Sequence, residues 1–248
     1  MKRKVFLVLP TYNEEGNIGR LLDRIEETMN KFSLTPYEII LIDDGSNDST
    51  EKIVSSRSKK MPIIFEKHDK NMGLGATIRD GLYTASKLAS DRDILITMDA
   101  DDTHTPKVII RMVRMISEGY CVVIASRFQP GSKTIGVPLI RKILSFGASW
   151  LFRLIMPING VRDYTCGYRA YSSKVIKNAI NRYGKSFIDQ DGFQCMVDIL
   201  LKFRKTNITF GEVPLILRYD SKKGKSKMNI PATIKNTMVL LIKRRLGI

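Results

Sequence analysis

The most constraining feature of the sequence is an apolar run at residues 94–98 that ends in three carboxylates within four positions, Asp99, Asp101 and Asp102. Such a run predicts a buried strand. Like charges grouped at the end of a strand repel one another, so we expect a cation between them. Carboxylate oxygens suit Mg²⁺ or Mn²⁺, which often complete their coordination with water and a substrate's phosphates. The run therefore predicts a divalent cation held by Asp99 and Asp101.

An alternative interpretation of the same residues is a solvated acidic turn that leads into a helix. Thr105 and Pro106 form a good N-cap and first-turn pair for that helix. Alternation along an extended chain favours the cation site instead, because it places Asp99 and Asp101 on one side and Ala100 on the other. A short Asp-x-Asp pattern is a weak motif, and both interpretations stay open at this point.

The first half of the chain alternates predicted strands with predicted helices. Continuous apolar runs predict strands at residues 5–9, 37–42, 63–66, 93–98 and 121–125. The first four runs are each followed by apolar residues at helical spacing. Solidly apolar strands joined by amphipathic helices are typical of a mostly parallel sheet covered on both faces. We therefore expect an α/β fold, with one domain favoured for a chain of 248 residues.

Polar clusters follow the predicted strands, at residues 11–15, 43–49, 99–104 and 126–127. In an open parallel sheet, ligands bind outside the carboxyl ends of the strands, so topology alone brings these clusters to one cleft. The glycines at 73 and 75 form neither a P-loop nor a dinucleotide fingerprint, because the residues those motifs require are missing.

The charge balance is strongly basic. The chain has 41 Lys and Arg residues against 25 Asp and Glu, a formal net charge of +16. This excess favours an anionic partner, and anionic lipid and nucleic acid both qualify. Thermal stability, or charge scattered for solubility, is the alternative explanation.

Cysteine usage and hydropathy favour a cytoplasmic location. Three cysteines form no CxxC pair, so neither a disulfide framework nor a zinc site is predicted. The apolar run at residues 5–9 is too short for a signal peptide. No stretch reaches the roughly 18 uninterrupted apolar residues that a membrane span needs.

The motifs carry a family resemblance. Residues 9–14 (LPTYNE), 42–46 (IDDGS), 71–75 (NMGLG) and 98–101 (MDAD), in this order, resemble the inverting glycosyltransferases of family 2, which have a Rossmann-like GT-A fold. Residues 126–127, 141–145, 163–169 (DYTCGYR) and 224–227 (GKSK) resemble the dolichyl-phosphate mannose synthases in particular. The match covers nearly the whole chain.

The resemblance implies which residues hold a nucleotide-sugar donor. They are Pro10, Tyr12, Glu14, Ile42, Asp44, Asp99, Ala100, Asp101, Arg127, Arg218 and Lys227. A Mg²⁺ or Mn²⁺ ion held by Asp99 and Asp101 would bridge the diphosphate. The family often has Gln or Ser where Thr103 stands, and an apolar residue in place of Asp102, so the third protein ligand stays open. Ordinary helix-entry chemistry is the alternative role for Tyr12 and Glu14.

The acceptor implied by the resemblance is a lipid monophosphate. A phosphomonoester is mostly ionised near neutral pH because its second pKa is about 6, so no general base is required. Asp101 and Arg127 are the implied catalytic residues, and Arg127, Arg141 and Ser145 the implied phosphate ligands. A spacing of four puts Arg141 and Ser145 on one helical face. Without the resemblance, Arg141 is expected to be a solvated helix residue.

The basic stretch at residues 218–227 resembles a loop that closes over the donor diphosphate in this family. The interval from Arg218 to Gly224 is longer here, so Lys222 or Lys223 is an alternative to Arg218. A basic loop that meets only bulk anions is the other interpretation. For His68 and His104 we expect structural or solvated roles.

Two segments, 139–158 and 230–248, combine apolar and basic residues. They are too charged to span a bilayer but suit helices that lie in a membrane interface, with core helices as the alternative. We therefore expect a catalytic domain at residues 1–229 and a basic amphipathic segment at 230–248. A membrane-anchoring subunit is a possible further partner.

The resemblance thus implies a metal-dependent enzyme that transfers mannose from GDP-mannose to dolichyl or polyprenyl phosphate with inversion. We expect such a reaction to supply a lipid-linked sugar for glycosylation at the cytoplasmic face of a membrane. The nearest alternative is a UDP-glucose polyprenyl-phosphate glucosyltransferase. An alternative of another class is a basic nucleic-acid-binding protein, which lacks a recognised motif here, so no nucleic acid is expected as a partner.

Overall fold

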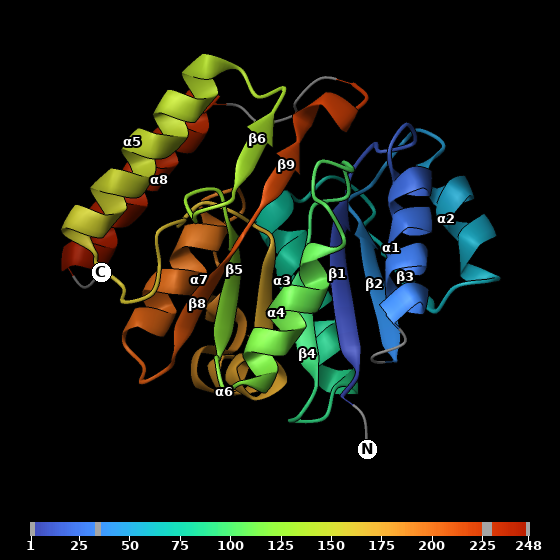
Figure 1. Cartoon of the computed structure of the whole chain (residues 1–248), viewed down its shortest axis with the longest axis horizontal. Helices are drawn as coiled ribbons and strands as arrows, with labels where there is room; N and C mark the ends of the chain where they lie inside the picture. Colours follow the sequence, from blue (N-terminus) through green and yellow to red (C-terminus); the bar gives the residue numbers. More distant parts are fainter. Residues whose placement is uncertain (1–2, 33–35, 225–229, 247–248) are drawn as a thin grey trace.

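A computed structural model describes residues 3–32, 36–224 and 230–246. Its centre is a seven-stranded sheet in the order β3-β2-β1-β4-β7-β5-β8 (Figure 1). The strands are β1 (Val5–Thr11), β2 (Tyr37–Asp43), β3 (Ile63–Lys67), β4 (Ile94–Thr97), β5 (Val122–Ser126), β7 (Arg169–Ser172) and β8 (Phe210–Pro214). β7 pairs antiparallel with β4 and β5, and the other neighbouring strands pair in parallel. The predicted mostly parallel α/β sheet is confirmed.

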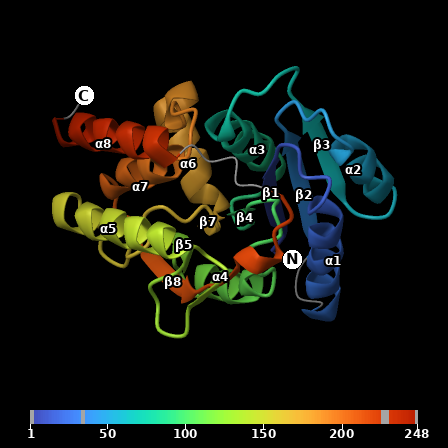
Figure 2. The ribbon, with the colours of Figure 1, turned by 90° about the horizontal axis from the view of Figure 1, so that it is seen from above.

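Helices cover both faces of this sheet. Figure 2 shows α3 (Leu74–Leu88), α6 (Ser173–Tyr183) and α7 (Cys195–Arg204) along one face, and α1 (Ile18–Phe32) and α4 (Val108–Ser117) along the other. α2 (Thr50–Ser58) packs beside α1, and a short 3₁₀ turn, η1 (Gly184–Phe187), follows α6. The apolar residues at helical spacing in α1, from Ile18 to Met29, are all buried against the sheet. The helical face expected from the sequence in α1 therefore forms part of the core.

The parallel register brings strand ends to a common edge. Thr11 at the end of β1 pairs with Asp43 at the end of β2, and Thr97 at the end of β4 pairs with Val8. The strand β4 ends at Thr97, so Asp99 and Asp101 lie in the following loop and not on an alternating strand. Strand alternation, from which we expected these two carboxylates to face the same way, is therefore not what orients them.

A second, smaller sheet lies at the end of the molecule where β5 and β8 are found. β6 (Lys133–Ile135) and β9 (Ile216–Arg218) form a two-stranded parallel sheet, followed by the 3₁₀ turn η2 (Tyr219–Ser221). The helices α5 (Leu139–Ile155) and α8 (Ile230–Leu246) both lie at this end, away from β3 (Figures 1 and 2). No helix among residues 3–32, 36–224 and 230–246 is both long enough and apolar enough to cross a bilayer.

α8 is fastened to α7 by charge as well as by apolar packing. Arg244 donates from Nε and Nη2 to the two carboxylate oxygens of buried Asp198, at 2.7 and 3.0 Å. Leu240 and Leu241 of the same helix are also buried. The interfacial interpretation of this segment places Arg244 at lipid headgroups, whereas the structure pairs this partly exposed side chain with the buried Asp198 carboxylate. The division into domains 1–229 and 230–248 stays a prediction.

Candidate active site

A cavity of about 1080 Å³ opens at the carboxyl ends of the strands, bounded further by α5, residues 191–193 and the first turns of α8. Its lining includes nine of the predicted site residues: Pro10, Tyr12, Glu14, Asp44, Asp99, Ala100, Asp101, Arg127 and Ser145. Ile42 lies behind the wall in the core and Arg218 lies outside the cavity. The side chain of Arg141, and Lys227 as a whole, lie outside the described residues.

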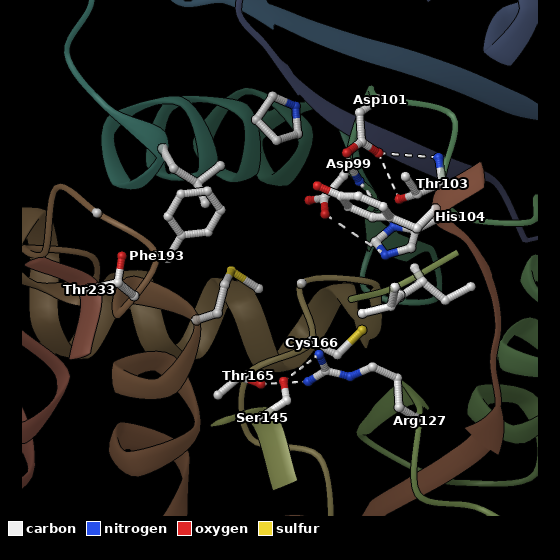
Figure 3. A pocket seen from close by; sticks show the side chains of 18 of the residues that line it. Asp99, Asp101, Thr103, His104, Arg127, Ser145, Thr165, Cys166, Phe193 and Thr233 are labelled. Atoms are coloured by element: carbon white, nitrogen blue, oxygen red, sulfur yellow. Dashed lines mark hydrogen bonds and ion pairs between the residues drawn. The ribbon is translucent and has the colours of Figure 1, made fainter. Parts of the chain in front are cut away.

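Asp99 and Asp101 form an acid cluster at one side of the cavity (Figure 3). Burial and the Asp101 charge raise the pKa of Asp99 above its ordinary value. For Asp101, burial also acts upward, but the Lys222 ammonium and His104 outweigh it and lower the pKa. His104 stacks on Tyr168 with ring centroids 4.9 Å apart, and its Nε2 lies 3.8 Å from Asp99 Oδ2. The pKa values of the two carboxylates are thus shifted in opposite directions, that of Asp99 upward and that of Asp101 downward.

The residues next to the cluster have separate roles. Thr103 donates from Oγ1 and from its backbone N–H to Asp101 Oδ1, at 2.7 and 3.2 Å, and so orients that carboxylate. Asp102 adopts a positive φ of 58° and turns away from the cavity, where it pairs with Arg20 and Arg24 of α1. Asp102 is thus part of the packing between α1 and the loop, and only two of the three carboxylates face the ligand space.

The acid cluster fits a divalent cation that a substrate helps to coordinate. Among the residues that the structure describes, no group of three His, Cys, Asp or Glu side chains could hold a metal ion alone. Mg²⁺ commonly needs only one or two carboxylates together with water and substrate phosphates. A cation already lies at this position in the form of the Lys222 ammonium, 2.7 Å from Asp101 Oδ2. Asp99 and Asp101 would hold the metal, with the Thr103 hydroxyl beside them.

On another wall of the cavity, Arg127 is fixed by a buried carboxylate (Figure 3 shows its contacts with Ser145 and Thr165). Asp163, which is fully buried, accepts bonds from Arg127 N, Nε and Nη2 at 3.0, 2.8 and 2.7 Å. Arg127 also donates from Nη1 to Ser145 Oγ at 2.9 Å and from Nη2 to Thr165 Oγ1 at 2.5 Å. Burial lowers the pKa of Arg127, but the charge and hydrogen bonds of Asp163 raise it by more. The pKa therefore lies above its ordinary value, and this guanidinium stays charged.

A further part of the cavity wall is formed by the end of β1, by Asp44 just after β2, and by the start of α3. Asp44 accepts backbone N–H bonds from Met72 and Gly73, each at 2.8 Å, and a 2.8 Å bond from His68 Nδ1. The other ring nitrogen of His68 lies 3.1 Å from Asp80 Oδ2. His68 therefore has the structural role that we expected, and Asp44 both lines the cavity and ties β2 to the loop before α3.

Glu14 is held at the entry to α1. Its backbone N–H donates to Thr50 Oγ1 at 2.8 Å, and its Oε2 accepts from Asn17 Nδ2 at 2.7 Å. The carboxylate is nearly buried yet contributes to the cavity wall. Glu14 thus adds a third negative charge near Asp99 and Asp101, and this charge contributes to the raised pKa of Asp99.

Several site residues are not predicted from the sequence. Asp163 is predicted only as a member of the DYTCGYR motif at residues 163–169, and that motif is the one signal in the sequence that marks it. Phe193 and Thr233 line the cavity from the loop before α7 and from α8, and Lys142 lines it from α5. No local pattern marks these three residues, because tertiary packing alone brings them to the cavity.

The fold and the cavity define the class of this protein. Two carboxylates and a fixed arginine face one cavity at the carboxyl ends of a sheet covered on both faces, which is where open α/β proteins bind their ligands. The model of "Glycosyl transferase family 2" matches residues 6–181. The chain belongs to glycosyl transferase family 2, and the family predicted from its motifs is confirmed.

Curated relatives point in the same direction. The chain is 30% identical over 226 residues to a dolichol-phosphate mannosyltransferase of Pyrococcus furiosus, covering 91% of this chain and 59% of that protein. It is also 27% identical over 229 residues to a polyprenol monophosphomannose synthase of Mycolicibacterium smegmatis, covering 92% of this chain and 82% of that protein. The chain thus spans less than two thirds of the length of the Pyrococcus relative.

Solved structures confirm the GT-A fold. Glucosyl-3-phosphoglycerate synthase from Mycobacterium tuberculosis, in complex with Mn²⁺, UDP and phosphoglyceric acid, superposes with a TM-score of 0.71 at 19% identity, covering 98% of this chain and 78% of that chain. Mannosyl-3-phosphoglycerate synthase from Rubrobacter xylanophilus gives a TM-score of 0.64 at 17% identity, covering 99% and 74%.

Proposed function

We propose that this protein is a polyprenyl-phosphate mannosyltransferase that uses GDP-mannose and inverts the anomeric carbon. The observation that carries the proposal is the pairing of an acid cluster, at Asp99 and Asp101, with the fixed arginine Arg127 in one cavity. The relatives named as lipid-phosphate mannosyltransferases support the sugar and the acceptor. Membership in glycosyl transferase family 2 argues against the nucleic-acid-binding alternative.

The chemistry needs positioned charge more than a proton acceptor. The acceptor phosphate is already ionised near neutral pH and attacks the sugar directly, while the diphosphate leaves from the other face. A divalent cation held by Asp99 and Asp101 would supply positive charge to that leaving group. The protein's own part is to orient the two phosphate groups and to keep the anomeric carbon between them.

In this proposal, Arg127 acts mainly as a hydrogen-bond donor of fixed orientation and less as a free positive charge. An arginine has five N–H donors, and four of those in Arg127 are used by Asp163, Ser145 and Thr165. The remaining N–H, on Nη1, is left for the acceptor phosphate. Because the Asp163 charge offsets that of Arg127, the phosphate needs a further cation, and Lys142 lines the same cavity. Arg141 completes the proposed acceptor site, as the family resemblance implies.

The nucleotide is proposed to lie against the part of the cavity wall formed by the end of β1 and the start of α3. Pro10, Tyr12 and Asp44 line this part of the cavity, together with Glu14. Ile42 acts from behind, since its buried side chain packs against α3 near Gly81. Arg218 pairs with Asp220 at 2.9 Å, outside the cavity, while Lys222 reaches the acids. This arrangement favours Lys222 over Arg218 for the charge that meets the diphosphate.

The lipid tail is proposed to leave along α5 and α8 into the cytoplasmic face of a membrane. α5 exposes apolar side chains along most of its length: Leu139, Ile140, Ile143, Leu144, Phe146, Trp150 and Leu154. Ile143, Leu144 and Phe146 also line the cavity, so the apolar surface runs from the site to the outside. A helix that lies in the interface with a basic protein surface around it binds anionic headgroups. A membrane-anchoring subunit would strengthen the same attachment.

The test is a donor assay. The protein is incubated with polyprenyl phosphate, Mn²⁺ and either GDP-mannose or UDP-glucose, and the lipid product is identified by mass spectrometry. We expect mannosyl lipid from GDP-mannose. Turnover of UDP-glucose alone would establish the glucosyltransferase instead, and turnover of neither donor would reject the proposal.

A matched pair of variants tests the acid cluster in the same assay. We expect Asp101→Asn to lower turnover by about 10³-fold, the scale seen when one stabilising group of this kind is lost. Asp91→Asn removes an exposed carboxylate outside the cavity and should leave turnover unchanged. Full turnover in the Asp101 variant would remove the metal from the proposed mechanism.

A further inference from the structure

The Lys222 side chain is the best placed of the described cations to neutralise the acid cluster. Its ammonium lies 2.7 Å from Asp101 Oδ2, and only 10% of the side chain is exposed. Its charge also acts on Asp99, and Glu14 acts on it in turn. A lysine that served only as a solvated surface charge would keep its ammonium in water. Lys222 instead directs it into the cavity.

The segment that carries Lys222 is fastened on both sides. Lys223 donates its backbone N–H to Asn17 Oδ1 at 2.8 Å, and Asn17 Nδ2 returns a 3.0 Å bond to Lys223 O. Arg20 donates to Ser221 O at 2.6 Å, and Arg218 N donates to Thr103 O at 2.9 Å. These bonds hold residues 218–223, here called the strap, across the space between α1 and the loop that bears Asp101.

We propose that Lys222 is a built-in counter-cation that competes with the divalent metal for Asp101, so that metal binding and release of the strap are coupled. The inference rests on the proposed function and deepens it, since it concerns how the same site is loaded. Without metal, the ammonium offsets the charges of Asp101, Asp99 and Glu14 and keeps the strap in place. A divalent ion at the same carboxylate repels the ammonium, because like charges brought into contact are strongly unfavourable.

Displacement of Lys222 then serves the next step of binding. The freed ammonium remains on the strap beside the cavity, close to where the metal-bound diphosphate would lie. Coupling of this kind is reciprocal: whatever weakens the Lys222 contact strengthens metal binding, and metal binding weakens the strap.

The first experiment measures Mn²⁺ binding to the protein alone, without nucleotide, by the loss of the free-ion signal in electron paramagnetic resonance. We compare the wild type with Lys222→Met and Lys223→Met. We expect Lys222→Met to bind Mn²⁺ about tenfold more tightly, because the competing part-buried cation is gone. Lys223→Met removes the neighbouring charge and should leave the affinity unchanged. Equal or weaker Mn²⁺ binding by Lys222→Met would overturn the proposal.

The second experiment uses the unaltered protein and does not depend on how a variant folds. Amide hydrogen exchange of peptides that cover the strap is measured with and without Mn²⁺. We expect faster exchange in the strap when Mn²⁺ is present, and unchanged or slower exchange would count against displacement. Wild-type transfer to lipid phosphate is assayed alongside. If the wild type is active but Lys222→Met does not bind Mn²⁺ more tightly, only the counter-cation proposal is refuted. If the wild type is inactive, the proposed function is refuted.

Discussion

Asp163 and Arg127 are joined by three hydrogen bonds, from the backbone N, Nε and Nη2 of the arginine to a carboxylate that no solvent reaches. Asp163 also accepts a backbone N–H from Cys166 at 3.1 Å. The guanidinium is therefore set in one orientation before any ligand arrives. A side chain that donates hydrogen bonds to a phosphate group benefits from such a fixed orientation.

Asp163→Asn should destabilise the protein in a pH-dependent way. Burial raises the pKa of Asp163, but Arg127 and the hydrogen bonds outweigh it, so the folded pKa lies below the ordinary 3.8. A depressed carboxyl pKa contributes stability that is complete above the unfolded pKa and is lost as pH falls through the folded one. We expect the free energy of unfolding, measured with urea at pH 7, to fall by about 3–5 kcal/mol. The difference from wild type should shrink below pH 3.8; a constant difference would contradict this account.

Gly75→Ala should destabilise the junction between α3 and the loop before α7. A Cβ at Gly75 would lie 1.6 Å from Gln190 O, and Gly75 N already donates to Asp191 O at 2.8 Å. We expect a loss of about 2 kcal/mol or more, because backbone must move. The control is Gly147→Ala in α5, where nothing lies within 4 Å of the added atom. It should stabilise by about 0.5–1 kcal/mol. Thermal melts that rank the two variants the other way would refute the contact.

Arg244→Ala should loosen α8 without unfolding the sheet. The variant loses the two-bond pair with Asp198, although Lys202 still lies 2.8 Å from that carboxylate. We expect faster hydrogen exchange in α8 and little change in the strands. Arg245→Ala changes an exposed neighbour and serves as the control. Equal exchange in both variants would show that apolar packing alone holds the helix.

Trp150 should report contact with a membrane. It is the single tryptophan of the chain and is 58% exposed on α5. Vesicles that contain anionic lipid should move its fluorescence to shorter wavelength, and neutral vesicles should do so much less, because the chain is strongly basic. The double change Ile140→Glu and Leu154→Glu, at two exposed positions of the same helix, should abolish the effect. An unchanged spectrum with anionic vesicles would argue against α5 as the membrane surface.

The three cysteines should differ sharply toward thiol reagents. Burial raises the pKa of Cys166 and of Cys195 to about 12 each, so almost no thiolate forms near neutral pH. Cys121 is partly exposed. Titration of native protein with a chromogenic disulfide should therefore modify Cys121 first, with the other two following only on unfolding. Rapid reaction of two or more thiols in the native state would contradict this burial.

Local pattern in the sequence accounts for much of the fold and part of the site. Apolar runs predict the strands of the first half and α1, and the expected parallel topology brings Asp99, Asp101 and Arg127 to one cleft, as observed. The turn of Asp102 toward Arg20 and Arg24 escaped prediction, because it depends on a single positive φ and on helix packing. The family motifs marked residues 163–169 but not the burial of the Asp163 carboxylate beside Arg127.

Contacts between distant segments account for the rest. Lys222 meets Asp101 because the chain returns across the cavity after β9, and Arg244 meets Asp198 because α8 packs on α7. Spacing along the sequence carries no record of such contacts. β7 was also missed, since four residues that include Arg169 and Ser172 have too little apolar pattern to predict a strand.

The antiparallel strand β7 has one more consequence. It lies between β4 and β5, so the loop that bears Asp99 and the turn that bears Arg127 leave the sheet two strands apart. At the usual spacing between neighbouring strands, that separation is about 10 Å. In the proposed reaction, the distance between the loop that would hold the leaving diphosphate and the arginine that would hold the acceptor phosphate is thus set by backbone pairing, which thermal motion of long side chains alters little.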